Sequence, residues 1–234
     1  MPLPVIIILA ALLLPVATWL AWRLVSGRSS PPCPTSLAGM LDNPFSRRYY
    51  SRILSRLELS PGLQVLDAGC GPGLLTAAIA AAVGPRGRVL ALDIQAGMIA
   101  KAKTRVERAG LDNVDYMVCP LGGCKLPASL FDRALLVTVL GEIPDKVAAL
   151  REIRSSLKPQ GFLSITEVLP DPHYQSLRKV LALAERTGFR FRSKVGGALT
   201  FTVNLESTDG TVRRAGASNP PNKYEMPPAR GTFG

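Results

Sequence analysis

The chain has 234 residues, which leaves room for one domain of ordinary size with extensions at its ends. Hydrophobic residues make up 47% of it and the mean hydropathy is +0.20, which is high for a soluble protein. The formal net charge of +11 suits a nucleic acid, an anionic membrane surface or an acidic substrate as partner. Because the sequence lacks zinc-finger spacing, an aromatic RNA-binding signature and long basic runs, no nucleic-acid partner is expected.

The first segment predicts a transmembrane anchor over residues 1–25. Residues 3–25 read LPVIIILAALLLPVATWLAWRLV, with no charge before Arg23. About 20 apolar residues suffice to cross the hydrocarbon core, and Trp19 and Trp22 stand near the end of the run, where aromatic rings favour the interface. A cleaved signal peptide is the alternative, but the usual basic start is missing and the run is long for one.

Arginines follow this apolar run, at positions 23, 28, 47 and 48. Positive flanks stay in the cytoplasm, so a single-pass membrane protein with its folded domain in the cytoplasm is expected. Residues 26–43 contain Ser, Pro and Gly without periodicity and are interpreted as a linker.

Residues 44–57 predict a helix with two stripes at four-residue spacing. The apolar stripe is Tyr49, Ile53 and Leu57, and the basic stripe is Arg48, Arg52 and Arg56. Such a helix either caps the domain or lays its arginines on anionic lipid headgroups, and the sequence leaves both interpretations open.

From residue 63 onward, strands alternate with helices. The expected strands are 63–69, 88–94, 113–118, 131–139 and 161–168, the expected helices are 73–83, 96–109, 145–157 and 173–188, and 189–195 with 199–205 form a hairpin. This order predicts an α/β domain over 44–205, with a Rossmann-like, seven-stranded, mainly parallel sheet and helices on both faces. The tail 206–234 has almost no apolar pattern and is predicted to be disordered.

A glycine-rich turn follows the first predicted strand in VLDAGCGPG, with glycines at positions 69, 71 and 73. Such a turn lets a ligand approach the backbone closely. The dinucleotide spacing GxGxxG would need a glycine at Leu74, and no P-loop lysine follows, so neither phosphate-binding motif fits. Asp67, just before the turn, would repel phosphates and suits a ligand with positive charge, such as a sulfonium or an ammonium.

Asp93 ends the second predicted strand. A carboxylate there can accept hydrogen bonds from both ribose hydroxyls of a nucleoside. Taken alone, Asp93 would equally well be a helix cap. Its place after the glycine turn makes the ribose role the favoured interpretation.

Together these stretches resemble the class I S-adenosylmethionine (SAM)-dependent methyltransferases, near the ubiquinone/menaquinone C-methyltransferase-like (methyltransferase type 11) group. The similarity rests on VLDAGCGPG, GRVLALDIQAGMIAKAK, FDRALLVTVLGEIPDKVAALREIRSSLKPQG and GFLSITE. The resemblance implies SAM as the cofactor, with its amino-acid part at the glycine turn, its ribose at Asp93 and its adenine along Ile94 and Met98. The cofactor-binding residues that it implies are Asp67, Gly69, Cys70, Gly71, Gly73, Asp93, Ile94, Met98 and Cys119.

The chain departs from the family pattern in CPLGGCKLP, residues 119–127, where an acidic residue usually meets the adenine. Adenine contact there would fall to backbone groups or to Cys119. The other cysteines, Cys33, Cys70 and Cys124, form no CxxC pair with it, and His173 is the only histidine. No metal site is therefore expected, and disulfides are not expected in a cytosolic domain.

Methyl transfer is an in-line displacement that depends mainly on positioning, and a base is needed only when the acceptor must lose a proton. Three catalytic candidates should lie at the carboxyl ends of the strands, where ligands bind in open α/β sheets: Glu142, Glu167 and His173. Glu142 could instead be a first-turn helix acid. His173 could instead be a surface residue behind a helix start at Asp171 and Pro172.

The sequence therefore predicts a membrane-anchored SAM-dependent methyltransferase for a lipophilic small molecule: a quinone precursor, a phospholipid amine, or a hydrophobic thiol or phenol. The substrate is expected to reach the site from the bilayer, because residues 3–25 and the basic helix 44–57 would hold the domain there. The alternative is a catalytically silent SAM-binding sensor or scaffold at the membrane, which the missing adenine acid favours. RNA methylation is disfavoured, since no Asn-Pro signature follows the fourth strand.

Overall fold

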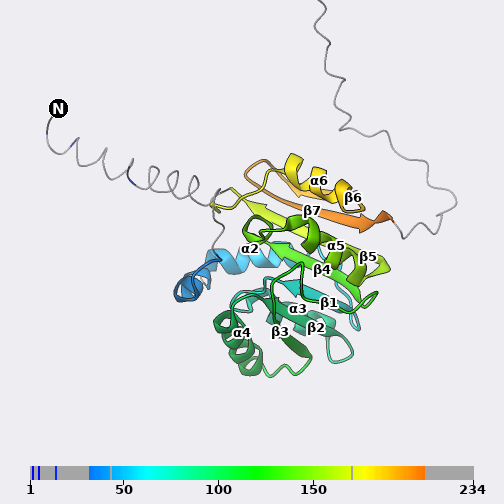
Figure 1. The fold of residues 1–234 in the computed structure, drawn as a ribbon. Helices are drawn as coiled ribbons and strands as arrows, with labels where there is room; N and C mark the ends of the chain where they lie inside the picture. The colour runs from blue at the N-terminus through cyan, green and yellow to red at the C-terminus, as the bar shows by residue number, and fades with distance from the viewer. Residues whose placement is uncertain are drawn as a thin grey trace, which may run out of the picture.

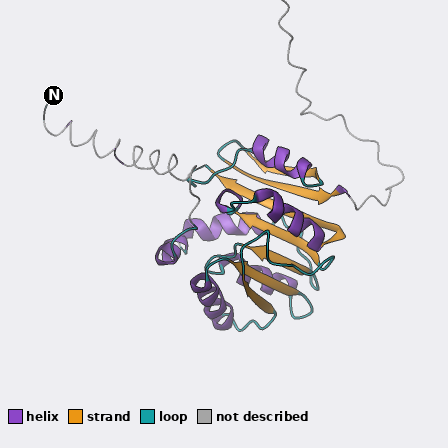
Figure 2. Ribbon diagram, viewed as in Figure 1, coloured by secondary structure: helices purple, strands orange, loops and turns teal. Residues whose placement is uncertain are grey.

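The structure is a computed structural model, and it describes Pro2, Val5, Leu14 and residues 32–42, 44–169 and 171–208. These residues form one seven-stranded sheet in the order β3-β2-β1-β4-β5-β7-β6, with helices on both faces (Figure 1). Figure 2 shows the same layers by secondary structure. The predicted Rossmann-like α/β fold with a seven-stranded, mainly parallel sheet is confirmed.

Most element boundaries fall within a few residues of those expected from the sequence. The strands are β1 (Gln64–Ala68), β2 (Arg88–Asp93), β3 (Val114–Val118), β4 (Phe131–Val137), β5 (Leu157–Val168), β6 (Phe189–Gly196) and β7 (Thr200–Ser207). The helices are η1 (Thr35–Leu41), α2 (Pro44–Leu54), α3 (Leu74–Val83), α4 (Ala96–Arg108), η2 (Leu140–Glu142), α5 (Lys146–Ser156) and α6 (Leu177–Arg186). Strands β1 to β5 pair in parallel, and β7 runs antiparallel to β5 and β6.

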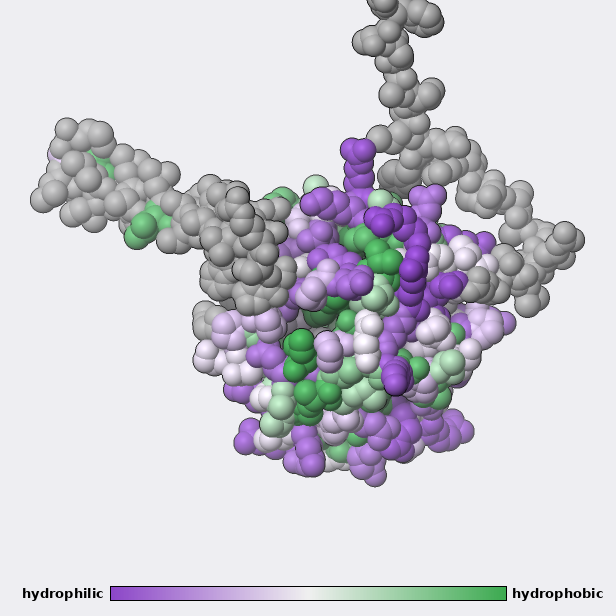
Figure 3. Space-filling model, viewed as in Figure 1, coloured by the Kyte–Doolittle hydropathy of each residue, from purple (hydrophilic) through white to green (hydrophobic). Residues whose placement is uncertain are grey.

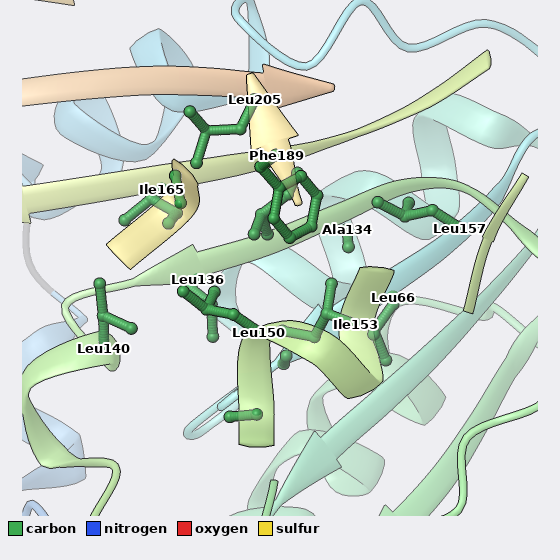
Figure 4. Packing of buried hydrophobic residues seen from close by; sticks show 14 of the residues in the cluster. Leu66, Ala134, Leu136, Leu140, Leu150, Ile153, Leu157, Ile165, Phe189 and Leu205 are labelled. Carbon is green, nitrogen blue, oxygen red and sulfur yellow. The ribbon is translucent and has the colours of Figure 1, made fainter. Parts of the chain in front are cut away.

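The helices divide between the two faces of the sheet. Helices α2, α3 and α4 pack in a row on one face, and α5 and α6 pack on the other. Polar residues cover much of the surface seen in Figure 3, with smaller apolar patches between them. Beneath it, Leu150 and Ile153 of α5 face Leu66, Ala134 and Leu136 of the sheet (Figure 4), and all five are fully buried.

The apolar stripe that the sequence predicts is buried, since Ile53 of α2 and Leu57, just after the helix, are both fully buried. Arg48 and Arg52 are exposed on the outer side of the helix. The helix thus caps one face of the sheet and still presents basic side chains to its surroundings. It ends at Leu54, and the remaining residues of the predicted stripes lie in the turn that follows.

Helix α6 begins at Leu177, after the start at Asp171 and Pro172 that the sequence predicts. Asp171 instead closes a tight turn, in which its side chain accepts a hydrogen bond from the His173 amide (2.6 Å) and its carbonyl accepts one from the Tyr174 amide (3.1 Å). The predicted helix start was therefore wrong, because the same residue types also favour turns of this kind.

The stretch expected to be a linker includes a packed segment. Residues 35–41 form η1, Ala38 is buried, and Asp42 makes an ion pair with Arg105 of α4 (3.0 Å). The predicted anchor over 1–25, apart from three single residues, lies outside the described residues, as does the tail from residue 209. Among the residues that the structure describes, no helix combines the length and the apolar character needed to cross a membrane.

Candidate functional site

A pocket lies where the sheet changes its winding direction. From β1 the chain proceeds to β2 on one side, and β4 follows on the other side, so the carboxyl ends of β1 and β4 border a crevice. The pocket there has a volume of about 390 Å³, within the range typical of small-molecule sites. Asp67, Asp93 and Thr138, which lie at or just after the ends of β1, β2 and β4, contribute to its wall.

The glycine turn between β1 and α3 forms the floor of this pocket. Gly69, Gly71 and Gly73 all have positive φ (75°, 52° and 77°), a conformation that favours glycine. A Cβ on Gly69 would overlap the Val139 side chain, and one on Gly73 would overlap the Ala102 backbone. A Cβ on Gly71 would meet nothing within 4 Å, so this glycine faces open space at the pocket. The turn therefore packs closely at Gly69 and Gly73, and at Gly71 its backbone is open for contact with a ligand.

Asp67 is buried under the turn, and its carboxylate accepts a hydrogen bond from the Thr76 hydroxyl at the start of α3 (2.6 Å). Burial raises the pKa of Asp67 to about 6, and the nearby Asp93 contributes in the same direction. A cationic ligand group in the pocket would stabilise the ionised form. The environment of Asp67 thus fits the positive charge that its place in the sequence suggests.

Asp93 joins the glycine turn to the start of α4. Its two oxygens accept hydrogen bonds from the backbone amides of Gly71 (3.0 Å) and Gln95 (2.9 Å). Each carboxylate oxygen has two acceptor positions, so one on each oxygen is left for a ribose hydroxyl. Asp93 lines the pocket, as the ribose interpretation requires. The helix-cap interpretation is wrong, because the N-cap of α4 is Gln95 and Asp93 lies two residues before it.

The side of the pocket assigned to adenine contains Ile94, Met98 and Cys119. Met98 is buried, whereas the Ile94 side chain is 53% exposed. Cys119 forms a disulfide with Cys124, which the sequence analysis did not expect. The expectation rested on a cytosolic compartment, and it overlooked that the turn Pro-Leu-Gly-Gly brings the two cysteines together.

Thr138, just after β4, is the one residue of the pocket wall with positive φ that is not a glycine (57°). A β-branched residue in this region is strained by about 1–3 kcal/mol. Its amide donates a hydrogen bond to the Thr166 carbonyl of β5 (2.9 Å), which helps to hold the strained conformation. Such strain is concentrated at functional sites, and here it directs the chain from β4 into the pocket wall.

Glu142, at the end of η2, lines the pocket next to Ile143 and Pro144. Burial raises the pKa of its carboxyl to about 8, with contributions from Asp171 and Asp93, and a hydrogen bond from the Cys33 amide opposes the shift. A carboxyl with such a pKa in a cleft is a candidate for proton transfer near neutral pH.

The other two catalytic candidates do not line the pocket. Glu167 is buried at the end of β5, where Oε2 accepts a hydrogen bond from the Gln175 amide (2.9 Å) and Oε1 has no partner among the described residues. Burial raises its pKa to about 8. His173 is also buried, and its backbone lies so close to Gly141 that a Cβ there would overlap it. Both residues support the wall that carries Glu142.

Several pocket residues escape the sequence analysis. They are Pro32, Cys33, Tyr50, Gln95 and Val139. Gln95 holds the N-terminal segment in place, since its side-chain amide donates a hydrogen bond to the Cys33 carbonyl (2.9 Å). No sequence signal marks Pro32 or Cys33, because a stretch without periodicity resembles any linker. Within the described residues no group of three metal-ligating side chains occurs.

Comparison with known proteins identifies this architecture. Residues 65–161, which include the glycine turn, Asp93, Cys119 and Glu142, match the family model of the methyltransferase domain. These residues therefore form a methyltransferase domain. A solved SAM-dependent methyltransferase from Aquifex aeolicus is 26% identical, with a TM-score of 0.68 over 74% of this chain and 98% of that one.

Curated relatives of the methyltransferase domain include the ubiquinone/menaquinone biosynthesis C-methyltransferase UbiE of Shewanella frigidimarina, which is 33% identical over 141 residues, or 60% of this chain. The chain spans only 55% of the length of that relative. Phosphoethanolamine N-methyltransferase 2 of Haemonchus contortus, solved with S-adenosyl-L-methionine, shares the fold (24% identity, TM-score 0.54, covering 61% of this chain and 36% of that one). The fold is thus shared by methyltransferases for different acceptors, and the acceptor must be argued from the site.

Proposed function

We propose that this chain transfers the methyl group of SAM to a lipophilic small molecule whose acceptor position must lose a proton, and that Glu142 accepts this proton. The observation that carries the proposal is the position of Glu142: a half-buried carboxyl, with a pKa of about 8, in the wall of the pocket that also contains the glycine turn.

The pocket residues fit SAM. Asp67 offers negative charge to its cationic part, Gly71 offers a bare backbone, and Asp93 keeps acceptor positions for the ribose. When bound, SAM supplies an electrophilic methyl group on a sulfonium that leaves as a neutral thioether. The residues of this chain then need only hold the acceptor in line and remove its proton.

The acceptor end of the pocket favours an apolar ring with one polar group. Ile143 and Pro144 follow Glu142 in the pocket wall, and Tyr50 and Leu121 add further apolar surface to the pocket. As a bond forms between the acceptor and the methyl carbon, the acceptor proton passes to the Glu142 carboxylate and later to solvent. A quinone precursor meets this description, since a ring carbon must lose its proton, and so does a hydrophobic phenol or thiol. The similarity to the Shewanella frigidimarina C-methyltransferase supports the first of these.

The membrane is the proposed location, with the methyltransferase domain on the cytoplasmic side. The apolar run 3–25 supports an anchor, and the arginines after it support this orientation. Arg48 and Arg52 are exposed on α2 and are free to meet anionic headgroups. The bilayer would then deliver the lipophilic acceptor.

The test is incubation of the purified full-length chain in vesicles with labelled SAM and total membrane lipid, followed by mass analysis of methylated products. A methylated apolar product is expected from the wild type, and Glu142→Gln should form it about 100-fold more slowly. Glu185→Gln, which alters an exposed acid on α6, is the matched control and should retain wild-type activity. SAM binding without any product would support the sensor instead, and the absence of SAM binding would disprove the proposed activity and support the scaffold.

A further inference from the structure

Several large apolar side chains reach the surface of the folded domain, and three of them lie at one edge of the sheet. In the folded domain described by residues 32–42, 44–169 and 171–208, six such side chains are more than a third exposed. They are Ile94 (53%), Val118 (52%), Leu130 (38%), Phe191 (47%), Val195 (50%) and Leu199 (64%). Ile94 belongs to the pocket wall, and Leu130 lies at the opposite edge, just before β4 begins.

Three of them form what we call the apolar rim: Val118, Val195 and Leu199. Val118 ends β3, at one margin of the sheet, while Val195 and Leu199 flank the turn from β6 to β7, at the other margin. Because β6 runs parallel to β5, this turn lies at the same edge as the carboxyl ends of β1, β2 and β4. With strands about 4.8 Å apart, the rim spans roughly 30 Å across the mouth of the pocket.

Hydrogen bonds fix the exposed turn in place. The Leu169 amide donates to the Leu199 carbonyl (2.7 Å), and the Tyr174 hydroxyl donates to the Ala198 carbonyl (2.7 Å). Across the turn itself, the Gly197 amide donates to the Thr200 carbonyl (2.9 Å). Val195 and Leu199 are thus exposed on an ordered support. Singly exposed apolar side chains are common on folded domains, so the meaning of these three depends on what lies beside this edge of the sheet.

The start of the described chain indicates what meets this rim. Pro32 and Cys33 line the pocket, so the chain enters the domain at the same edge. In Figure 1 the blue start of the described chain lies on the side toward which the arrowheads of β4 and β5 point. Six residues, 26–31, separate this entry from the apolar run 3–25. Such a segment spans at most about 25 Å, so the surroundings of the run lie within reach of the rim.

We infer that the apolar rim inserts into the lipid bilayer that residues 3–25 enter, so that the mouth of the pocket opens onto lipid. The inference rests on the proposed anchoring. The edge also carries the carboxyl groups of Asp145 and Asp171 and the ammonium of Lys194, so its charge is mixed. Insertion is therefore driven by apolar burial, and zwitterionic lipid should suffice.

The experiment uses photo-crosslinking in the full-length chain, because it reads lipid contact independently of catalysis. The photoreactive residue p-benzoylphenylalanine replaces Leu199 in one variant and Leu130 in a matched control, and both are reconstituted into labelled phosphatidylcholine vesicles. Flotation first establishes that the chain is bound to the vesicles. At least about tenfold more lipid adduct is expected at position 199 than at position 130. Transfer of an apolar side chain of leucine size from water into lipid favours the inserted state by at least about this factor.

Three outcomes would overturn the inference. Equal lipid adducts at the two positions would show that the rim does not face the bilayer. Adducts between two copies of the chain at position 199 would make the rim a protein interface. A chain that does not float with the vesicles would show that the rim does not insert into a bilayer. If lipid adducts form at position 199 while no lipid is methylated, insertion of the rim is supported and the proposed activity is disproved. Failure of the insertion and failure of the activity can therefore be told apart.

Discussion

Two buried carboxyl groups, Asp67 and Asp93, surround the glycine turn with negative charge. For Asp67→Asn we expect SAM affinity to fall about tenfold or more, because the cationic cofactor loses an ionic partner. Calorimetry measures this directly. Asp112→Asn, which alters an exposed acid in the loop before β3, is the control and should bind SAM as the wild type does.

The same substitution should change stability in a pH-dependent way. The pKa of Asp67 is about 6 in the folded chain, above its ordinary value of 3.8. The folded state therefore holds this proton more tightly, and the contribution of Asp67 to stability falls as the pH rises from 4 to 6. At pH 8, Asp67→Asn should exceed the wild type in unfolding free energy by about 1 kcal/mol or more. The difference should vanish below pH 4, and a constant difference across this range would refute the assigned pKa.

Gly69 and Gly71 have the same backbone conformation but different surroundings. Gly69→Ala should lower the melting temperature strongly, since its methyl group would overlap Val139. Gly71→Ala should lower it only slightly, because the strained backbone alone costs about 1 kcal/mol of unfolding free energy. Gly71→Ala should instead weaken SAM binding, because its methyl group enters the pocket. Thermal unfolding and SAM titration of both variants separate the two effects. Similar melting temperatures would contradict the close packing at Gly69.

Glu142 should set the pH dependence of the reaction. Its pKa of about 8 exceeds the ordinary 4.5 because burial, Asp171 and Asp93 disfavour the ionised form. A base must be ionised, so kcat/KM, which reports the free enzyme, should rise with pH and level off above about 8. Glu142→Gln should lose this rise together with most of the activity. Glu167→Gln removes a carboxyl of similar pKa that does not line the pocket, and its pH profile should keep the rise.

Residues that are near one another in sequence can be assigned to the site without a structure. The glycine turn, Asp67 and Asp93 follow two consecutive parallel strands, and such strands end at one edge. Glu142 can be assigned in the same way, because it follows β4, the strand that pairs with β1 on its other side. Cys33 and Tyr50 precede the sheet and reach the pocket through packing, which periodicity does not reveal.

At the scale of elements, the loop between β3 and β4 is held by the Cys119–Cys124 disulfide. A ring of this length stabilises a chain by about 2 kcal/mol in the entropic model. Reduction with dithiothreitol should lower the melting temperature and raise the KM for SAM a few-fold, since Cys119 lines the pocket, while kcat changes little. The double variant Cys119→Ser/Cys124→Ser should show the reduced behaviour with or without dithiothreitol. A response of the double variant to the reductant would assign the effect to another cysteine.

Strands and helices were predictable wherever apolar periodicity was strong. Each of β1 to β4 and α3 to α5 begins or ends within two residues of its expected range, because burial of one face fixes the pattern. The start of α6 was not predicted correctly, since Asp171 and Pro172 favour a turn as readily as a helix start. Helix η1 has no amphipathic pattern long enough to detect, and its packing on α4 determines it.

At the scale of the whole molecule, the segment 32–42 connects the apolar run to the methyltransferase domain and also closes the pocket. Its contacts include the Cys33 amide with Glu142, the Cys33 carbonyl with Gln95 and the ion pair of Asp42 with Arg105. The apolar run and the site are thus separated by only a short stretch of chain. Truncations on either side of it should separate the two roles.

Removal of residues 1–25 should abolish flotation with vesicles and leave SAM binding intact, because every described pocket residue lies beyond the cut. Removal of residues 1–43 also deletes Pro32, Cys33 and Asp42. We expect this longer truncation to bind SAM at least about tenfold more weakly and to melt at a lower temperature, since it loses part of the pocket wall together with the contacts to Gln95 and Arg105. Equal SAM affinity of the two truncations would mean that the segment 32–42 is only a connection. Flotation of the shorter truncation would mean that the domain surface, including the apolar rim, binds the bilayer without the run 3–25.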